Sequence, residues 1–331
     1  MHPSLLNVLR CPECHAGLSA AGADCSSGAV RSGVLACADC RKRFPIRNGI
    51  PWLVAGDNYA DSFGAQWTTF QTEQLDSVTG TSLSHDRFRA VTRWAPSELA
   101  NQWTLDAGCG AGRFAEVALE AGAHVVAVDM SNAVEACYAN LSRRFPDRLH
   151  VVRASIFELP FAPATFDKVF CIGAIQHTPD PVRAIRALAK MPKPGGQLAL
   201  WIYELSWKCL LGWKYYLRPI TRHLSTRLNY ALAYTLSLVL LPVWFPLGYL
   251  GKPGRFISML LPVAAANYVG KGYGARQCFR CVVLDTFDWY SPAYDRPQRF
   301  SRVWRILEEE GYGELTRTCG GVGIRGTRLS S

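Results

Sequence analysis

Four cysteines near the N-terminus stand in two pairs with metal-binding spacing. Cys11 and Cys14 form one Cys-x2-Cys pair, Cys37 and Cys40 form another, and 22 residues separate the pairs. Thiolates in two such pairs are typical of tetrahedral zinc sites with four cysteine ligands. Because four protein ligands leave no open coordination position, we expect a structural zinc ion that contributes to folding.

A second group of residues suits a nucleoside with a charged tail. Asp106 precedes a glycine-rich turn that contains Gly108, Cys109, Gly110 and Gly112, and Asp129 ends the next apolar stretch. Glycines at a strand-to-helix turn let a ligand approach the backbone closely. Arg113 stands where a dinucleotide-binding motif has its third small residue, which argues against a pyrophosphate ligand.

S-adenosylmethionine (SAM) fits this arrangement better than a dinucleotide. It carries an ammonium group that the Asp106 carboxylate can hold, while Asp129 can accept hydrogen bonds from both ribose hydroxyls. Met130 follows Asp129, and its flexible thioether can lie against the adenine ring. The alternative, a purely structural turn in another doubly wound fold, is less favoured because the acidic residues accompany the glycines.

Alternating strand and helix signals surround these residues, as a parallel α/β sheet requires. Five apolar strands are expected at residues 103–107, 124–129, 149–153, 168–173 and 197–203. Three helices are expected at residues 113–121, 131–138 and 181–191. Since carboxyl ends of parallel strands share one edge of a sheet, Asp106 and Asp129 should lie close together.

The sequence resembles a known family in three segments: LDAGCGAGRF, VVAVDMS, and the stretch from FELPF to GGQLAL. These resemble the UbiE-like class I SAM-dependent methyltransferases over roughly residues 103–203. The resemblance implies a doubly wound, mostly parallel seven-stranded sheet and places the carboxypropyl arm of SAM over the glycine turn. It also implies an adenine contact after the third strand, where Ser155 replaces the usual Asp and Ile156 follows, and a contact at Gly173 after the fourth.

Two upstream segments carry further resemblances. Phe63, Gln66 and Trp67 resemble the FG-x-QW segment of a subgroup whose N-terminal helices cap the cofactor, although they could simply pack a helix onto the sheet. Residues 5–54 resemble small zinc-ribbon proteins that activate RNA and protein methyltransferases. The ribbon therefore suggests either a translation-related substrate or, as we favour, a packing module fused to the enzyme.

Candidates for chemistry at the methyl group lie beyond the fourth strand. His177 is the best candidate for a general base, since an unperturbed imidazole titrates near neutrality, but it could instead order its turn. Tyr203 is a further catalytic candidate. Asp288 and Tyr290 are others, in a DWYSP segment that resembles the subgroup. No Asn-Pro-Pro-Tyr motif is present, which argues against methylation of planar exocyclic amines.

The net charge of +10 comes from one segment. Residues 205–280 contain ten Lys and Arg but no Asp or Glu, and 24 uncharged residues separate Arg227 from Lys252. We expect a helical apolar insertion that acts as a lid over the pocket or as a peripheral membrane contact. A true span at 228–251 is less favoured because prolines interrupt it, and nucleic-acid binding is less favoured because its apolar run carries no basic residue.

The expected organisation is a zinc ribbon at 1–55, cap or linker helices at 56–102, and a methyltransferase domain at 103–331 with an insertion at 204–284. We expect methyl transfer to oxygen or carbon of a small-molecule, glycan or lipid-linked acceptor. The alternatives are a methyltransferase for RNA or the translation machinery, and a non-catalytic SAM-binding protein. The sequence shows no export signal, so a cytoplasmic chain, peripheral to the inner face of the membrane, is expected.

Overall fold

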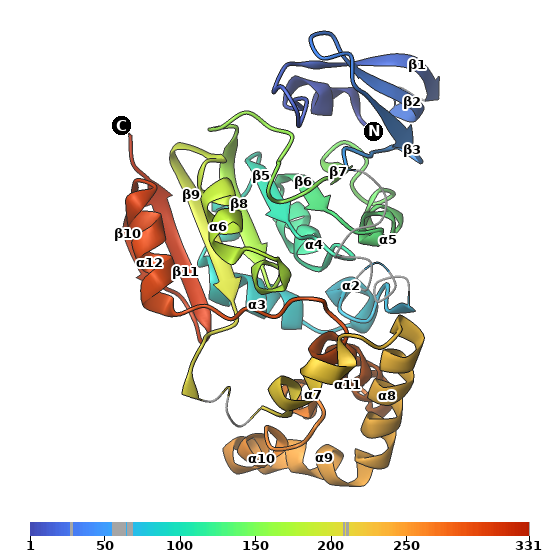
Figure 1. Ribbon diagram of the computed structural model, residues 1–331, viewed down its shortest axis with the longest axis vertical. Coiled ribbons are helices and arrows are strands. Elements are labelled where there is room, and N and C mark those ends of the chain that lie inside the picture. The colour runs from blue at the N-terminus through green and yellow to red at the C-terminus, as the bar shows by residue number, and fades with distance from the viewer. Residues whose placement is uncertain (27–28, 55–63, 65–68, 208, 210–211, 331) are drawn as a thin grey trace.

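The computed structural model describes residues 1–26, 29–54, 64, 69–207, 209 and 212–330, and its centre is a seven-stranded sheet (Figure 1). The strand order is β10-β11-β9-β8-β5-β6-β7, and β11 alone runs antiparallel to the other six strands. The strands are β5 Trp103–Ala107, β6 His124–Asp129, β7 Leu149–Arg153, β8 Phe166–Ile172, β9 Pro192–Ile202, β10 Tyr312–Arg317 and β11 Val322–Arg328. The predicted fold class is confirmed.

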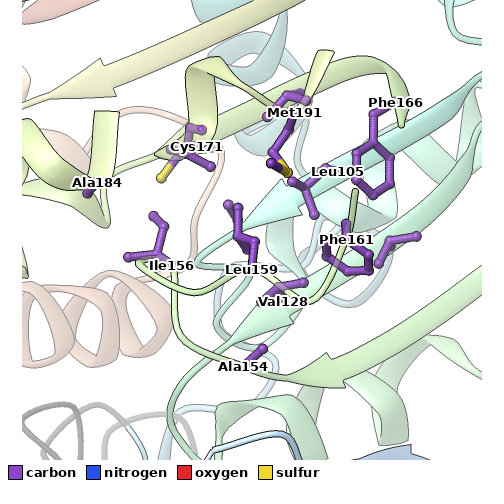
Figure 2. Close-up of a cluster of buried hydrophobic side chains, with 14 of the residues drawn as sticks. Leu105, Val128, Ala154, Ile156, Leu159, Phe161, Phe166, Cys171, Ala184 and Met191 are labelled. Carbon is purple, nitrogen blue, oxygen red and sulfur yellow. The ribbon is translucent and has the colours of Figure 1, made fainter. Parts of the chain in front are cut away.

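Alternating side chains along the strands divide the apolar core into two layers. In β6, Val126 and Val128 belong to the layer beneath α6 (Pro181–Ala189) and α12 (Phe300–Glu309). Their neighbours Val125 and Ala127 belong to the layer beneath α3, α4 and α5. Both layers are apolar because successive side chains of a strand point to opposite faces. Figure 2 shows part of the first layer, around Leu105 and Phe166.

The helices of this core begin and end at the expected signals. They are α2 Asp76–Thr79, α3 Leu83–Thr92, η2 Pro96–Glu98, α4 Arg113–Glu120, α5 Ala133–Leu141 and η3 Ile175–His177, in addition to α6 and α12. The Asp180 carboxylate caps α6 by accepting hydrogen bonds from two backbone N–H groups, and Gly122 stops α4 with a φ of 91°. Ser131 was expected as the N-cap of α5, but Asn132 takes that position and the helix starts at Ala133. The Ser131 hydroxyl accepts from the Ala133 N–H and donates to Asp129.

The N-terminal ribbon covers the exposed edge of the sheet at β7. It consists of η1 Pro3–Asn7 and the antiparallel strands β1 Leu18–Ser26, β2 Ala29–Cys37, β3 Arg43–Arg47 and β4 Ile50–Pro51. The Leu53 N–H donates to the Arg153 carbonyl over 2.8 Å, and the Trp52 ring lies between the guanidinium groups of Arg47 and Arg153. Because an open edge strand can pair with other chains, this contact protects the sheet.

The insertion forms a separate group of helices at the end of the molecule opposite the ribbon (Figure 1). Its elements are α7 Trp213–Thr221, α8 Thr226–Val239, α9 Leu241–Leu247, η5 Gly248–Leu250, α10 Gly251–Ser258, η6 Ala265–Asn267 and α11 Ala275–Tyr290. The expected boundary at residue 284 falls inside α11, so this helix joins the insertion to the DWYSP segment. Within the described residues no single helix is long and apolar enough to cross a membrane, although residues 226–239 and 241–258, bent by 67°, together meet those criteria.

We predict that His150, beneath the ribbon, makes stability depend on pH. Its ring is 2% exposed and stacks on Trp103, and burial, with smaller effects from His2, His124 and the N-terminal amine, lowers its pKa from 6.5 to about 4. The unfolded chain therefore binds this proton more readily than the folded chain. The free energy of unfolding should be highest above about pH 6.5 and fall by roughly 3 kcal/mol as the pH drops to about 4.

Chemical denaturation across this pH range checks the prediction. His150→Phe keeps a ring against Trp103 and should flatten the slope below pH 6.5. An equal slope in both proteins would show that groups other than His150 cause it.

Candidate functional site

A cavity of about 1120 Å³ opens at the carboxyl ends of β5, β6 and β8. The glycine turn after β5 forms its floor, α3 forms one wall, and residues of α7 and α11 form another. In open α/β sheets, ligands bind beyond the carboxyl ends of the strands, where the connections reverse direction. This cavity is therefore the candidate active site.

The glycine turn has two faces with different roles. Gly108, Cys109 and Gly110 line the cavity, and a Cβ on Gly108, whose φ is 80°, would lie 2.4 Å from the Ala174 Cβ. Only glycine is compatible with that position. Gly112 was also expected to contact the cofactor, but it faces α5, where a Cβ would lie 2.7 Å from Leu141 Cδ1. Its placement indicates that Gly112 serves the packing of α4 on α5.

Asp106 and Asp129 lie at the ends of neighbouring strands, as expected. Asp129 lines the cavity, and its Oδ2 accepts a hydrogen bond from the Gly110 N–H over 3.0 Å, while its Oδ1 accepts from Ser131. Asp106 does not line the cavity; it is 2% exposed, and its Oδ2 has no hydrogen-bond partner within the described part of the chain. Burial, and next the charge of Asp129, raise the pKa of Asp106 well above its usual value.

These two carboxylates fit the groups that SAM presents. A buried carboxylate oxygen without a partner, beside a second carboxylate, is stabilised by a cation, and the ammonium of SAM is one. Met130 and Ile156 add apolar surface to the cavity next to Asp129 and suit an adenine ring. The chemistry of the site thus matches the expected cofactor.

The remaining predicted cofactor residues differ in their placement. Gly173 and Arg113 line the cavity, and the Arg113 guanidinium also donates to Ser84 Oγ. Ser155 does not line it, because its hydroxyl turns to accept a hydrogen bond from the Phe157 N–H. Of the two residues expected to contact adenine near the end of β7, Ile156 is therefore the one that lines the cavity.

Three more predictions concern Phe63, Gln66 and Trp67, which lie outside the described residues. Gly64 between them is described, and a Cβ there would lie 3.4 Å from Asn132, next to α5. Their role as a cap over the cofactor stays a prediction.

His177, Tyr203 and Asp288 meet on the cavity wall. The Tyr203 hydroxyl donates to Asp288 Oδ2 over 3.2 Å, and His177 Nε2 lies 3.7 Å from the same oxygen. His177 Nδ1 lies 3.2 Å from the Tyr294 carbonyl. Because a carbonyl oxygen can only accept a hydrogen bond, Nδ1 is the donor in this contact, and Nε2 is the ring nitrogen that faces Asp288.

Tyr290, the fourth catalytic candidate, does not reach the cavity. On α11, Asp285, Asp288 and Trp289 share one helical face and line the cavity. Tyr290 is rotated away from that face, is fully buried, and donates its hydroxyl to the Pro262 carbonyl. Its placement supports packing of the insertion instead of catalysis.

Sequence reasoning missed cavity residues from α3 and from the insertion. The Arg87 guanidinium lies 4.0 Å from the Trp201 ring, and burial, with Arg113 nearby, lowers its pKa. Lys214 lines the cavity, lies over the Tyr203 ring at 4.1 Å and pairs with Asp295 over 2.7 Å. The four-residue spacing of Lys214 and Arg218 could have indicated a polar inner face of α7.

The four predicted zinc ligands converge in the ribbon. Their sulfur atoms all lie within 4.8 Å of one another, with Cys11 and Cys40 3.6 Å apart and Cys14 and Cys37 3.4 Å apart. Tetrahedral zinc at about 2.3 Å from each sulfur places sulfurs about 3.8 Å apart, so the cluster fits this ion. Zinc bound there would join the turn that follows η1 to the turn between β2 and β3 and would serve folding.

We predict that loss of one thiolate removes the metal. Cys40→Ser should lower the zinc content from about one ion per chain to near zero, because the remaining three thiolates hold the ion too weakly. Elemental analysis of purified protein measures this. Cys209→Ser, outside the cluster, should keep its zinc, and equal zinc in both variants would refute the assignment.

We also predict that Asp129 controls affinity for SAM. Asp129→Ala should weaken binding roughly 10- to 100-fold, the loss expected for hydrogen bonds to a charged group. Calorimetric titration measures it. Asp147→Ala, an exposed position before β7, is the matched control and should bind as the wild type does; unchanged affinity in the Asp129 variant would contradict the site.

Comparisons with known proteins agree with these two sites. Residues 105–200 match the methyltransferase domain family, and residues 2–49 match the Trm112p-like protein family. Together these segments hold the glycine turn, both carboxylates, His177 and the four cysteines.

Individual relatives are similar to shorter parts of the chain. Ubiquinone biosynthesis O-methyltransferase of Stutzerimonas stutzeri is 33% identical over 111 residues, covering 30% of this chain and 44% of that protein. The protein of the same name in Hahella chejuensis is 37% identical over 101 residues, covering 30% and 42%. The chain thus spans less than half the length of these relatives.

Among solved structures, a complex between the Haloferax volcanii Trm112 methyltransferase activator and a methyltransferase is 12% identical to this chain. The similarity covers 82% of this chain and 99% of that one, with a TM-score of 0.42. Taken with the sites above, the family matches identify residues 105–200 as a SAM-dependent methyltransferase domain and residues 2–49 as a Trm112p-like domain with a four-cysteine cluster that can bind zinc.

Proposed function

We propose that the chain transfers a methyl group from SAM to an oxygen or carbon atom of a small-molecule, glycan or lipid-linked acceptor. The observation that carries this proposal is the partnerless carboxylate oxygen of buried Asp106 beside Asp129, next to a cavity whose wall holds His177. Asp129 and His177 line one cavity, with Asp106 buried beside it, and methyl transfer from a sulfonium to a hydroxyl uses groups that orient the cofactor and a base that takes the proton.

SAM, when bound, supplies an electrophilic methyl group on a positively charged sulfur. The chain's own contribution is to hold and orient it. Asp106 would take the ammonium and Asp129 the ribose hydroxyls, while Met130 and Ile156 would contact the adenine. Holding the nucleoside at both ends directs the methyl group toward the cavity. Alignment of the methyl group with the acceptor atom there lowers the barrier to methyl transfer substantially.

His177 is suited to take a proton from an acceptor hydroxyl. Its Nδ1–H donates to the Tyr294 carbonyl, which fixes the ring and leaves the lone pair on Nε2. Asp288 lies 3.7 Å from Nε2, close enough to stabilise the imidazolium that results, and the Tyr203 hydroxyl holds Asp288 in place. This arrangement favours an oxygen acceptor, or a carbon acceptor activated by loss of a hydroxyl proton.

The walls of the cavity favour an acceptor with apolar surface. Tyr268, Leu284 and Trp289 of the insertion contribute to them, together with Trp201. Large apolar side chains around a few polar groups are typical of pockets for small molecules and for rings on larger carriers.

A second candidate, action on RNA or the translation machinery, is favoured by the Trm112p-like segment at residues 2–49. The ribbon, however, shares one continuous apolar core with the sheet, in which Leu5 and Leu9 lie with Leu105 and Val126. That packing supports a structural role for the ribbon.

Incubation of the protein with methyl-labelled SAM and an extract of the source cells tests the acceptor class. The extract is then separated into lipid, small-molecule and RNA fractions. Label in the lipid or small-molecule fraction is expected. Label in RNA alone would favour the second candidate, and no transfer to any fraction would support a non-catalytic SAM-binding protein.

We predict that His177→Gln lowers kcat roughly 10²- to 10⁴-fold, the usual contribution of a positioned base, while SAM affinity stays unchanged. Asp288→Ala should lower kcat as well. His124→Gln, at the opposite end of the sheet, is the matched control. Full turnover in the His177 and Asp288 variants would exclude them from catalysis.

A further inference from the structure

Two helices of the insertion, α7 and α8, bury small and polar residues where large apolar residues are usual. The residues that α7 buries are Lys214, Arg218 and Thr221, and those that α8 buries are Asn229, Ala233 and Ser237. A helix in water normally buries a stripe of large apolar residues, as α12 does with Val303, Ile306 and Leu307. Small and polar residues at helix contacts are instead typical of helices that meet lipid on their outer side.

The outer faces of these helices are correspondingly apolar. Ile220 on α7 is 68% exposed, Val239 on α8 is 67% exposed, and Phe256 on α10 is 54% exposed. Of the 20 exposed large apolar residues in the described part of the chain, 18 lie between Leu205 and Leu260. An apolar surface of this extent, confined to one part of a protein, marks an interaction site.

The charges on the same surface all have one sign. Arg222, Arg227, Lys252 and Arg255 are exposed, and no carboxylate pairs with them among the described residues. Residues 205–280 contain no Asp or Glu at all. An anionic partner with an apolar interior is complementary to this combination.

We propose that the outer face of α7, α8 and α10 docks onto a phospholipid bilayer that carries anionic headgroups. The apolar side chains enter the boundary between headgroups and acyl chains, and the arginines and lysines contact phosphates. Exposed Trp213, Tyr216 and Tyr249 suit this boundary because their rings are apolar with one polar atom. The bent pair of helices at 226–239 and 241–258 lies along the surface in this arrangement.

Other occupants match the surface less well. A second copy of the chain would bring two acid-free, basic faces together, and their like charges would repel. A nucleic acid would satisfy the arginines but would leave the uncharged outer face of α8, with Leu228, Leu238 and Val239, against phosphates and water.

Helix α7 links this surface to the cavity. Lys214 on its inner face lines the cavity, while the adjacent Trp213 is exposed on its outer face. For an acceptor anchored in the bilayer by an apolar tail, α7 would thus be the element that separates the membrane surface from the cavity that holds His177. This consequence rests on the proposed methyltransferase function, whereas the docking itself does not.

Co-sedimentation of the full chain with vesicles tests the docking. The probes are vesicles of phosphatidylcholine alone and of phosphatidylcholine mixed with phosphatidylglycerol. The wild type should bind the mixed vesicles, and less so as salt is raised. Leu238→Asp/Val239→Asp should lower the bound fraction at least about tenfold, because each charge must enter the apolar boundary.

Matched variants separate apolar from charge effects. Val78→Asp, at a residue 60% exposed outside the insertion, should bind as the wild type does. Arg222→Gln/Arg255→Gln should bind both vesicle types equally weakly. Unchanged SAM affinity and melting temperature in each variant show that the fold and the cofactor site are intact, so loss of docking is distinguishable from failure of the proposed function.

Three outcomes would overturn the proposal. In the first, the wild type binds neither kind of vesicle. In the second, the Leu238→Asp/Val239→Asp variant binds the mixed vesicles as well as the wild type does. In the third, light scattering without vesicles shows a wild-type dimer that this variant abolishes, which assigns the surface to a second copy of the chain.

Discussion

The pair of carboxylates at the ends of β5 and β6 is the constraint on which the rest of the structure depends. Asp106 is buried with one oxygen lacking a partner, and the nearby charge of Asp129 raises its pKa further. Such a pair destabilises a folded protein unless a cation compensates it. A site that retains this cost is typical of function, and under the proposed function the ammonium of SAM compensates it.

The elements around the two carboxylates hold them at one edge of the sheet. Parallel strands bring Asp106 and Asp129 together, and the missing Cβ of Gly108 lets the turn after β5 pack against Ala174. The insertion closes the cavity from the same end, whereas the ribbon packs at the other end of the molecule against the edge strand β7 (Figure 1). Stabilising and ligand-binding parts are thus separated along the long axis of the protein.

The sequence allowed prediction of the central sheet because buried parallel strands are short, continuous apolar runs with polar ends. Residues 103–107 and 124–129 match β5 and β6 in full. The carboxylates, the turn and the cysteine cluster followed from spacing alone. The placement of Tyr290 could not be predicted in this way. It depends on which face of α11 is turned toward the cavity, and the sequence does not show which face that is.

The faces that the insertion helices bury could not be predicted from the sequence, for a physical reason. Helical periodicity predicts that large apolar residues face inward, yet α8 turns Ser237 and Asn229 inward and Leu238 outward. This rule assumes that water surrounds the outer face of a helix, and α8 does not follow it. The cavity residues Arg87 and Lys214 were missed because they come from helices whose contacts with the sheet are not local in sequence.

The contact between Asp106 and the ligand ammonium is tested most directly by a thermodynamic cycle. Binding of S-adenosylhomocysteine and of its deaminated analogue would be measured with the wild type and with Asp106→Asn. The wild type should lose roughly 10- to 100-fold in affinity when the ligand lacks its amino group, and the variant should bind both ligands alike. Equal loss in both proteins, or no loss in the wild type, would contradict the account.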